Sequence, residues 1–172
     1  MDWSIVATLV GGLGVGSTIS TYLTSGRSRR EVKGAVLEKL SSVEAARWAG
    51  PSDPVPFSDF IAACRALETA ALIARVPRRA LLHYLKYAHA ARLNSEANWE
   101  RYGEEEVGGF ISNGISEAVR DSAETLTQVV WSPWSRVGLR WRLASDSTKI
   151  FRFSDKEDRE YIENAQKRLG GL

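Results

Sequence analysis

The chain has 172 residues, 26% of them charged, and its 23 Lys and Arg residues nearly balance its 21 Asp and Glu residues. This length suits one globular domain, alone or with a short accessory segment, and the small net charge gives no support for nucleic-acid binding by the molecule as a whole. One cysteine excludes an internal disulfide. One cysteine and two histidines are together too few ligands for a structural zinc site. We therefore expect neither a cofactor nor a metal.

The first predicted element is the stretch from Trp3 to Gly26, which contains no charged residue. As a helix it would rise about 36 Å, enough to cross a hydrocarbon core of ~30 Å with some tilt. Four basic residues follow it: Arg27, Arg29, Arg30 and Lys33. Under the positive-inside rule they place the N-terminus outside and the C-terminal side in the cytoplasm. We therefore expect a single-pass anchor at 1–26 in the cell membrane; a glycine-rich buried helix or strand-turn is the alternative.

Small residues recur at every fourth position within this stretch, among them Gly12, Gly16 and Ser20. Such a ridge lets two helices approach closely in lipid, so we expect self-association into a homo-oligomer. The run from Gly11 to Thr18 also invites comparison with a nucleotide-binding loop. Because Ser17 stands where the lysine of that loop would reach the terminal phosphates, nucleotide binding is not expected there.

Residues 27–56 are expected to form a juxtamembrane helix and then a proline-rich linker. The apolar residues of this helix recur at helical intervals: Val32, Val36, Leu40 and Val43. Three prolines between 51 and 56 cannot continue a helix, so the linker separates this element from residues 57–172, the expected cytoplasmic domain.

The cytoplasmic domain begins with three predicted helices, whose ranges are 58–76, 77–102 and 104–131. Ser58 is a plausible N-cap for the first, and Pro77 suits the first turn of the second. Each helix carries an apolar stripe on one side only. The three helices must therefore pack against one another as a small bundle.

The pattern changes after Ser132. The chain reads V-G-L-R-W-R-L at 137–143 and K-I-F-R-F at 149–153. Alternation with β-branched and aromatic residues predicts a β-hairpin near 137–153, and an Arg-rich amphipathic helix at 131–142 is the competing interpretation. A last helix follows Asp155. The predicted fold class is therefore mainly α, with an N-terminal single transmembrane helix followed by a small helical bundle with one C-terminal β-hairpin.

No arrangement of residues in the sequence predicts catalysis. His83 and His89 lie six residues apart on a predicted helix, so they point ~120° apart around its axis and cannot share a metal. Cys64 lies on an apolar stripe, which indicates a buried residue rather than a nucleophile. Nothing near Glu96 and Glu100 would tune this pair as acid and base. We therefore expect that the protein is not an enzyme.

The best functional candidate lies between Trp131 and Arg152, where basic and aromatic residues alternate. Its members are Trp134, Arg136, Arg140, Trp141, Arg142 and Arg152. A ribbon of this kind suits anionic lipid headgroups, at ~1 kcal/mol per basic residue, or an acidic protein partner. A nucleic-acid backbone is the least favoured partner. The alternative is that this stretch is an ordinary strand pair, with Trp inside and Arg outside, that binds no partner.

The expected function is that of a single-pass membrane-anchored protein whose cytoplasmic helical domain acts as a binding or regulatory module for an unidentified protein partner. Tethering to a membrane would raise the effective concentration of such a module near its partner. Two alternatives stay open. One is a membrane-acting effector that self-assembles through Gly-rich helices, and the other is a soluble enzyme or ligand-binding protein with a buried Gly-rich N-terminal helix.

Overall fold

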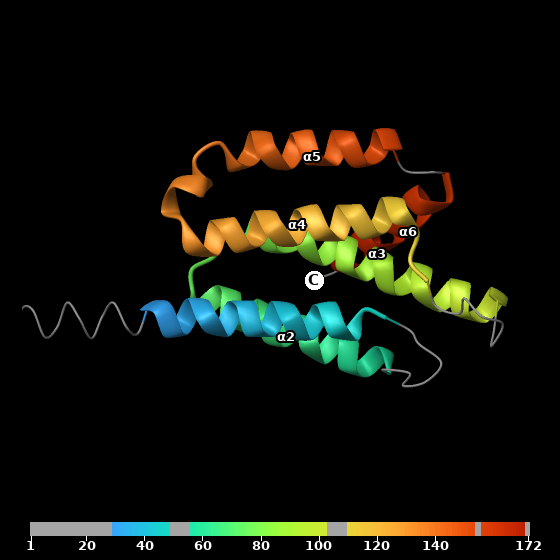
Figure 1. Ribbon diagram of the computed structural model, residues 1–172, viewed down its shortest axis with the longest axis horizontal. Coiled ribbons are helices and arrows are strands. Elements are labelled where there is room, and N and C mark those ends of the chain that lie inside the picture. The colour runs from blue at the N-terminus through green and yellow to red at the C-terminus, as the bar shows by residue number, and fades with distance from the viewer. Residues whose placement is uncertain (1–28, 49–55, 103–109, 154–155, 171–172) are drawn as a thin grey trace, which may run out of the picture.

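The computed structural model describes residues 29–48, 56–102, 110–153 and 156–170, and this part of the chain folds as a bundle of helices (Figure 1). Residues 29–46 are helical, and we call them the 29–46 helix. The further helices are α2 (Phe57–Ile73), α3 (Arg78–Tyr102), α4 (Asn113–Trp131), the short 3-10 helix η1 (Pro133–Arg136), α5 (Leu139–Phe153) and α6 (Lys156–Gly170). The predicted helical bundle is thus confirmed.

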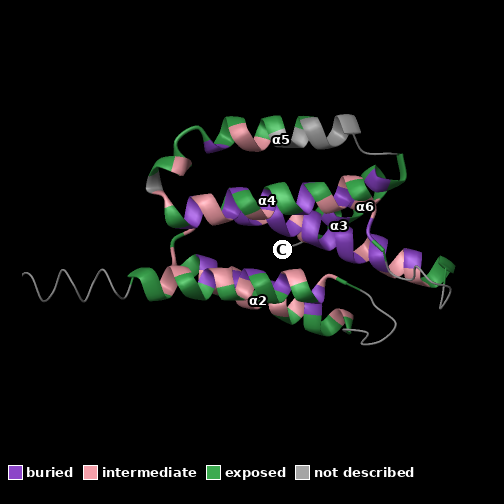
Figure 2. Cartoon of the chain, viewed as in Figure 1, coloured by how far each residue is buried: buried purple, intermediate pink, exposed green. Residues whose placement is uncertain are grey.

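The central helix of the bundle is α3, which contacts α2, α4, α5 and α6. It is buried along most of its length, whereas the coloured part of α5 is largely exposed (Figure 2). Small alanines at 88, 90 and 91 let neighbouring helices approach closely, while Tyr84 and Tyr87 fill space between them. Burial of this apolar surface is the main stabilising contribution to the bundle.

The 29–46 helix packs through the stripe that its sequence predicts, with Val36, Leu40 and Val43 buried. The buried Arg92 of α3 closes the C-terminal end of this helix, because its Nη1 donates to the carbonyl oxygens of Ala46 at 3.2 Å and Trp48 at 2.9 Å. The last carbonyls of a helix have no partner within it, and Arg92 supplies a donor to Ala46 and also to Trp48, which follows the helix.

The turn from α2 to α3 is tight and carries unusual backbone strain. The N–H of Val76 donates to the carbonyl of Ala71 at 2.9 Å, and that of Arg75 donates to the carbonyl of Leu72 at 3.0 Å. These bonds form a Schellman motif, in which the residue at the position of Arg75 adopts a left-handed conformation. Arg75 has φ 54°, where glycine is usual. A side chain in this conformation costs about 1 kcal/mol.

Polar residues at the other end of α3 position the starts of α4 and α6. Asn94 Oδ1 accepts from the backbone N–H of Ser112 at 2.9 Å, and Asn98 Nδ2 donates to the carbonyl of Phe110 at 2.8 Å. Ser112 is the N-cap of α4, and its hydroxyl donates to the buried Asp158 of α6 at 2.7 Å. Helix α4 therefore begins at Asn113, whereas the sequence predicts a helix from residue 104.

The predicted hairpin near 137–153 is wrong, because Leu139–Phe153 is helix α5 and no strand occurs in the ranges covered by the structure. The competing helix at 131–142 has the right type but the wrong bounds, since η1 and a turn at 137–138 separate α4 from α5. Leu139 and Leu143 lie four residues apart, the spacing of a helix face, and both pack inward. Val137 and Trp141 complete the alternation in the sequence, but they are exposed.

The transmembrane helix of the predicted fold class has no counterpart among the described residues. Among the helices that are described, none has both the length and the apolar composition needed to cross a bilayer. The segment predicted to do so, 3–26, lies outside the described residues, and so do Gly12, Gly16 and Ser20. The fold class of the described ranges is accordingly corrected to an all-helical bundle.

Candidate functional site

Basic residues gather at one end of the bundle, on the left in Figure 1. The described part of the 29–46 helix begins there, α2 ends and α3 begins there, and α4 passes through η1 into α5 there. We call this the basic end. Its cationic residues are Arg29, Arg30, Lys33, Arg75, Arg78, Arg79, Arg136 and Arg140. All of them are exposed except Lys33, which is half-buried.

Large apolar side chains are exposed among these cations. Trp134 of η1 is 82% exposed, Trp141 in the first turn of α5 is 84% exposed, and Val137 lies between them. Leu72 and Ile73, in the last turn of α2, are exposed as well. Exposed apolar side chains that cluster, unlike single ones scattered over a surface, indicate a contact with another molecule or with a membrane.

Lys33 links the 29–46 helix to the end of α4. Its Nζ donates to the backbone carbonyl of Trp131 at 3.1 Å and lies 5.7 Å from the centre of the Trp131 ring. A cation at this position stabilises the negative end of the α4 dipole. The sequence predicts Lys33 as a juxtamembrane residue and Trp131 as the start of the basic and aromatic stretch that ends at Arg152, so two predicted segments meet here.

The other predicted basic and aromatic residues are distributed differently. Arg136, Arg140, Trp134 and Trp141 are exposed at the basic end, as are Arg29 and Arg30 from the juxtamembrane set. Arg142 is half-buried, and its Nη2 donates to Gln128 Oε1 of α4 at 2.7 Å. This hydrogen bond holds the Arg142 side chain against α4. Arg152 is in the last turn of α5, but its side chain lies outside the described part of the chain, and so does Arg27.

Sequence reasoning missed three cations of the basic end: Arg75, Arg78 and Arg79. They border the turn between α2 and α3, and in the sequence they lie far from both Lys33 and Arg136. A signal was present, because consecutive helices joined by short turns run antiparallel and bring alternate turns to the same end. Basic residues at alternate helix ends are therefore neighbours in space.

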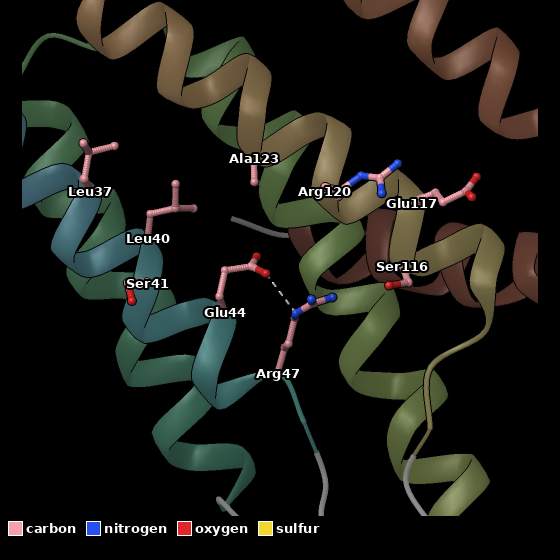
Figure 3. Close-up of a pocket in the computed structure, with 9 residues that line it drawn as sticks. All are labelled: Leu37, Leu40, Ser41, Glu44, Arg47, Ser116, Glu117, Arg120 and Ala123. Atoms are coloured by element: carbon pink, nitrogen blue, oxygen red, sulfur yellow. Dashed lines mark ion pairs between the residues drawn. The ribbon is translucent and has the colours of Figure 1, made fainter.

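A groove between the 29–46 helix and α4 is the second candidate site (Figure 3). It has a volume of about 460 Å³ and is lined by Leu37, Leu40, Ser41, Glu44, Arg47, Ser116, Glu117, Arg120 and Ala123. Two arginines face two glutamates, so the groove favours neither an anion nor a cation.

The polar groups of this groove are already engaged in part. Glu44 Oε2 lies 3.0 Å from Nε of Arg47, and Glu44 Oε1 accepts from the hydroxyl of Tyr84 at 2.6 Å. Burial, together with the Glu44 carboxylate, raises the pKa of Tyr84 far above its usual range, so the hydroxyl stays a donor. This arrangement ties the 29–46 helix to α3.

The histidines and the cysteine are buried and separate. His83 packs edge-on against Tyr87 and His89 against Phe60, with ring centres 5.0 and 4.9 Å apart. Burial, reinforced by Lys86 for His83 and by Arg168 for His89, lowers the pKa of each imidazole to about 4. Burial, with a smaller effect of Glu68, raises the pKa of the Cys64 thiol to about 12, which disfavours the nucleophilic thiolate.

Metal-binding side chains do not gather in the described part of the chain, where no group of three or more His, Cys, Asp or Glu residues could hold an ion. In the comparisons with known proteins, the chain matches no family model, no curated protein and no solved structure. The function must therefore be inferred from the residues of the chain itself, and the basic end carries the most specific chemistry.

Proposed function

We propose that the protein is a membrane-associated helical module that holds its basic end against an anionic lipid surface and presents the rest of the bundle to a cytoplasmic protein partner. The location at the cell membrane belongs to this proposal, and so does the partner. The observation that carries it is the combination of exposed Trp134 and Trp141 with cations from several elements at one end of the bundle.

Tryptophan suits the boundary between headgroups and acyl chains, because its ring is apolar while its N–H can bond to water or headgroups. Trp134, Val137 and Trp141 together offer apolar surface that could be buried at this depth. Exposed as they are, these side chains gain nothing from the bundle's own core. Insertion into a membrane interface would stabilise them by removing their apolar surface from water.

Cations beside these side chains would supply the attraction to the surface. Each basic residue near an anionic membrane contributes about 1 kcal/mol, and the attraction is screened within a Debye length of ~10 Å. Because the eight cations of the basic end lie together, the attraction would also orient the molecule. The aliphatic Leu72 and Ile73 at the same end favour lipid over nucleic acid, whose bases stack on aromatic rings.

The test is cosedimentation of the full chain with phosphatidylcholine vesicles, with and without phosphatidylglycerol. We expect stronger binding when phosphatidylglycerol is present, and weaker binding as salt is added. Replacing both Trp134 and Trp141 by alanine should weaken binding to the anionic vesicles by at least about tenfold. The matched control is Trp48→Ala, because Trp48 is partly exposed but lies beyond the opposite end of the 29–46 helix.

Equal binding to both vesicle types, or binding that the double tryptophan variant leaves unchanged, would contradict the proposal. Loss of binding in the Trp48→Ala control as well would point to a general loss of structure. Circular dichroism of all three proteins separates that outcome from a specific effect, because every element of the described fold is a helix.

A further inference from the structure

A pocket opens within the basic end, where four elements meet. Its volume is about 550 Å³, and its lining residues come from the 29–46 helix, the end of α2 with the turn after it, the end of α4 and η1. Half of them are cationic and the other half apolar: Arg29, Lys33, Arg75 and Arg136, with Val32, Ile73, Ala74 and Val130. No acidic residue is among the described residues that line it.

The arginines of this pocket have no counter-ion in the part of the chain that the structure describes. Among the described residues, no carboxylate forms an ion pair with Arg29, Arg75 or Arg136. Lys33 uses one of its donors on the Trp131 carbonyl, which holds its ammonium group near the pocket. Three guanidinium groups that pair with no described carboxylate, and the ammonium group of Lys33 beside them, repel one another around this hollow. An anion between them would remove that repulsion.

The backbone conformation of Arg75 indicates that fold stability alone does not explain an arginine at this position. Its left-handed conformation ends α2 in a position where glycine would avoid strain. The side chain at this position lines the pocket instead of packing in the core, and it is exposed. An arginine here therefore lowers the stability of the turn and adds a cation to the pocket.

We propose that this pocket binds an anion that carries more than one phosphate group, either the headgroup of a phosphorylated lipid or a free polyphosphate. Guanidinium groups match phosphate geometry because two parallel N–H donors can bond to two phosphate oxygens. Four cations suit several phosphate charges better than a single carboxylate. The lipid source rests on the proposed membrane association, while the binding of phosphate does not.

The first experiment is calorimetric titration of the full chain with inorganic pyrophosphate. We expect binding that weakens with salt, and a loss of about tenfold in affinity on Arg75→Gly or Arg136→Met. Arg65→Met is the matched control, because Arg65 is exposed on α2 but does not line the pocket. The control should bind pyrophosphate as the unmodified chain does.

Arg75→Gly also separates a binding role from a structural one. Because glycine relieves the left-handed strain, this variant should unfold about 2–4 °C higher while binding pyrophosphate more weakly. A residue retained only for stability would show the opposite change in melting temperature. Arg136→Met tests the pocket independently, since residue 136 has no left-handed backbone.

Vesicle binding then distinguishes the source of the phosphate. A larger gain from phosphatidylinositol bisphosphate than from phosphatidylglycerol, lost in Arg75→Gly, assigns the pocket to a lipid headgroup. Pyrophosphate binding without that gain assigns it to a free polyphosphate. Absence of pyrophosphate binding, or binding that both arginine variants leave unchanged, overturns the proposal that this pocket binds phosphate groups. That result leaves the proposed membrane association intact, because the latter is tested with phosphatidylglycerol and the tryptophan variants.

Discussion

His83 and His89 show how single residues in this bundle respond to the packing around them. Each ring lies edge-on to an aromatic neighbour, and His83 Nε2 and His89 Nδ1 are shielded from solvent without a hydrogen-bond partner among the described residues. An imidazolium in such surroundings loses its hydration and gains no counter-ion, which is why the pKa of both falls to about 4. Both histidines are neutral in the folded protein near pH 7.

This burial predicts that the fold is less stable in mild acid. In the unfolded chain each histidine titrates near 6.5, so the unfolded state binds more protons than the folded state between pH 6.5 and about 4. The contribution of the two neutral histidines to the unfolding free energy is fully present above pH 6.5, and it is lost as the pH is lowered through this window. The loss should be about 2 kcal/mol per histidine at pH 5. Urea unfolding of the unmodified chain and of His89→Phe, at pH 7 and pH 5, measures it; an unchanged pH difference in the variant would contradict the assignment.

At the scale of the element, the corner between α4 and α5 depends on one glycine. Gly138 has φ 72°, and its carbonyl accepts from the N–H groups of Trp141 and Arg142 at 3.0 and 3.1 Å as α5 begins. The left-handed conformation reverses the chain after η1 and lets α5 return along α4 (Figure 1). The exposed residues of the proposed membrane contact flank this corner, so its geometry determines where they lie.

Two glycines of the chain form a matched pair for testing this corner. A Cβ added to Gly138 or to Gly34 would meet no atom within 4 Å, so neither substitution causes a clash. Gly138→Ala should lower the unfolding free energy by about 1 kcal/mol, because alanine is strained at positive φ. Gly34→Ala should raise it by about 0.5–1 kcal/mol, because Gly34 lies within the 29–46 helix. Thermal unfolding followed by circular dichroism should show opposite shifts, and shifts of the same sign would refute this account of the corner.

At the scale of the whole molecule, α3 joins elements that are distant in the sequence. Arg92 is 4% exposed and pairs with Glu96 at 2.9 Å. It also donates to the carbonyls of Ala46 and Trp48 at the C-terminal end of the 29–46 helix. Asn94 and Asn98, on the same helix, hold the chain at the start of α4. These bonds satisfy backbone groups that are buried or half-buried, and they link the outer helices to α3.

Removing the guanidinium group of Arg92 should therefore weaken the whole bundle. Arg92→Met keeps an unbranched apolar stem but leaves the Ala46 and Trp48 carbonyls without this donor, and we expect a loss of about 3 kcal/mol in unfolding free energy. Arg65→Met, on the exposed face of α2, should change it by no more than about 0.5 kcal/mol. Urea unfolding compares the two, and equal effects would show that the buried bonds of Arg92 contribute nothing specific.

Helical periodicity along the sequence is enough to predict most of the elements of this protein. The stripe of the 29–46 helix and the bounds of α3 follow from apolar spacing and from proline, because a helix with one apolar side must bury that side. The hairpin prediction failed because a few alternating residues are too short a pattern to separate a strand from a helix. Leu139 and Leu143 fit both periods, and only packing against α3 and α4 decides between them.

The site depended on tertiary structure to a greater degree. Local composition was enough to mark Trp134, Arg136 and Trp141 as candidates, since a cluster of aromatic and basic residues is visible within a few positions of the sequence. The pocket beside them was not predictable in this way, because Arg29, Arg75 and Arg136 lie in three separate segments. Antiparallel packing of the helices brings those segments to one end, and the left-handed turn at Arg75 places its side chain on the pocket. The sequence alone thus determined which residues carry the charge, while the fold decided which of those charges meet.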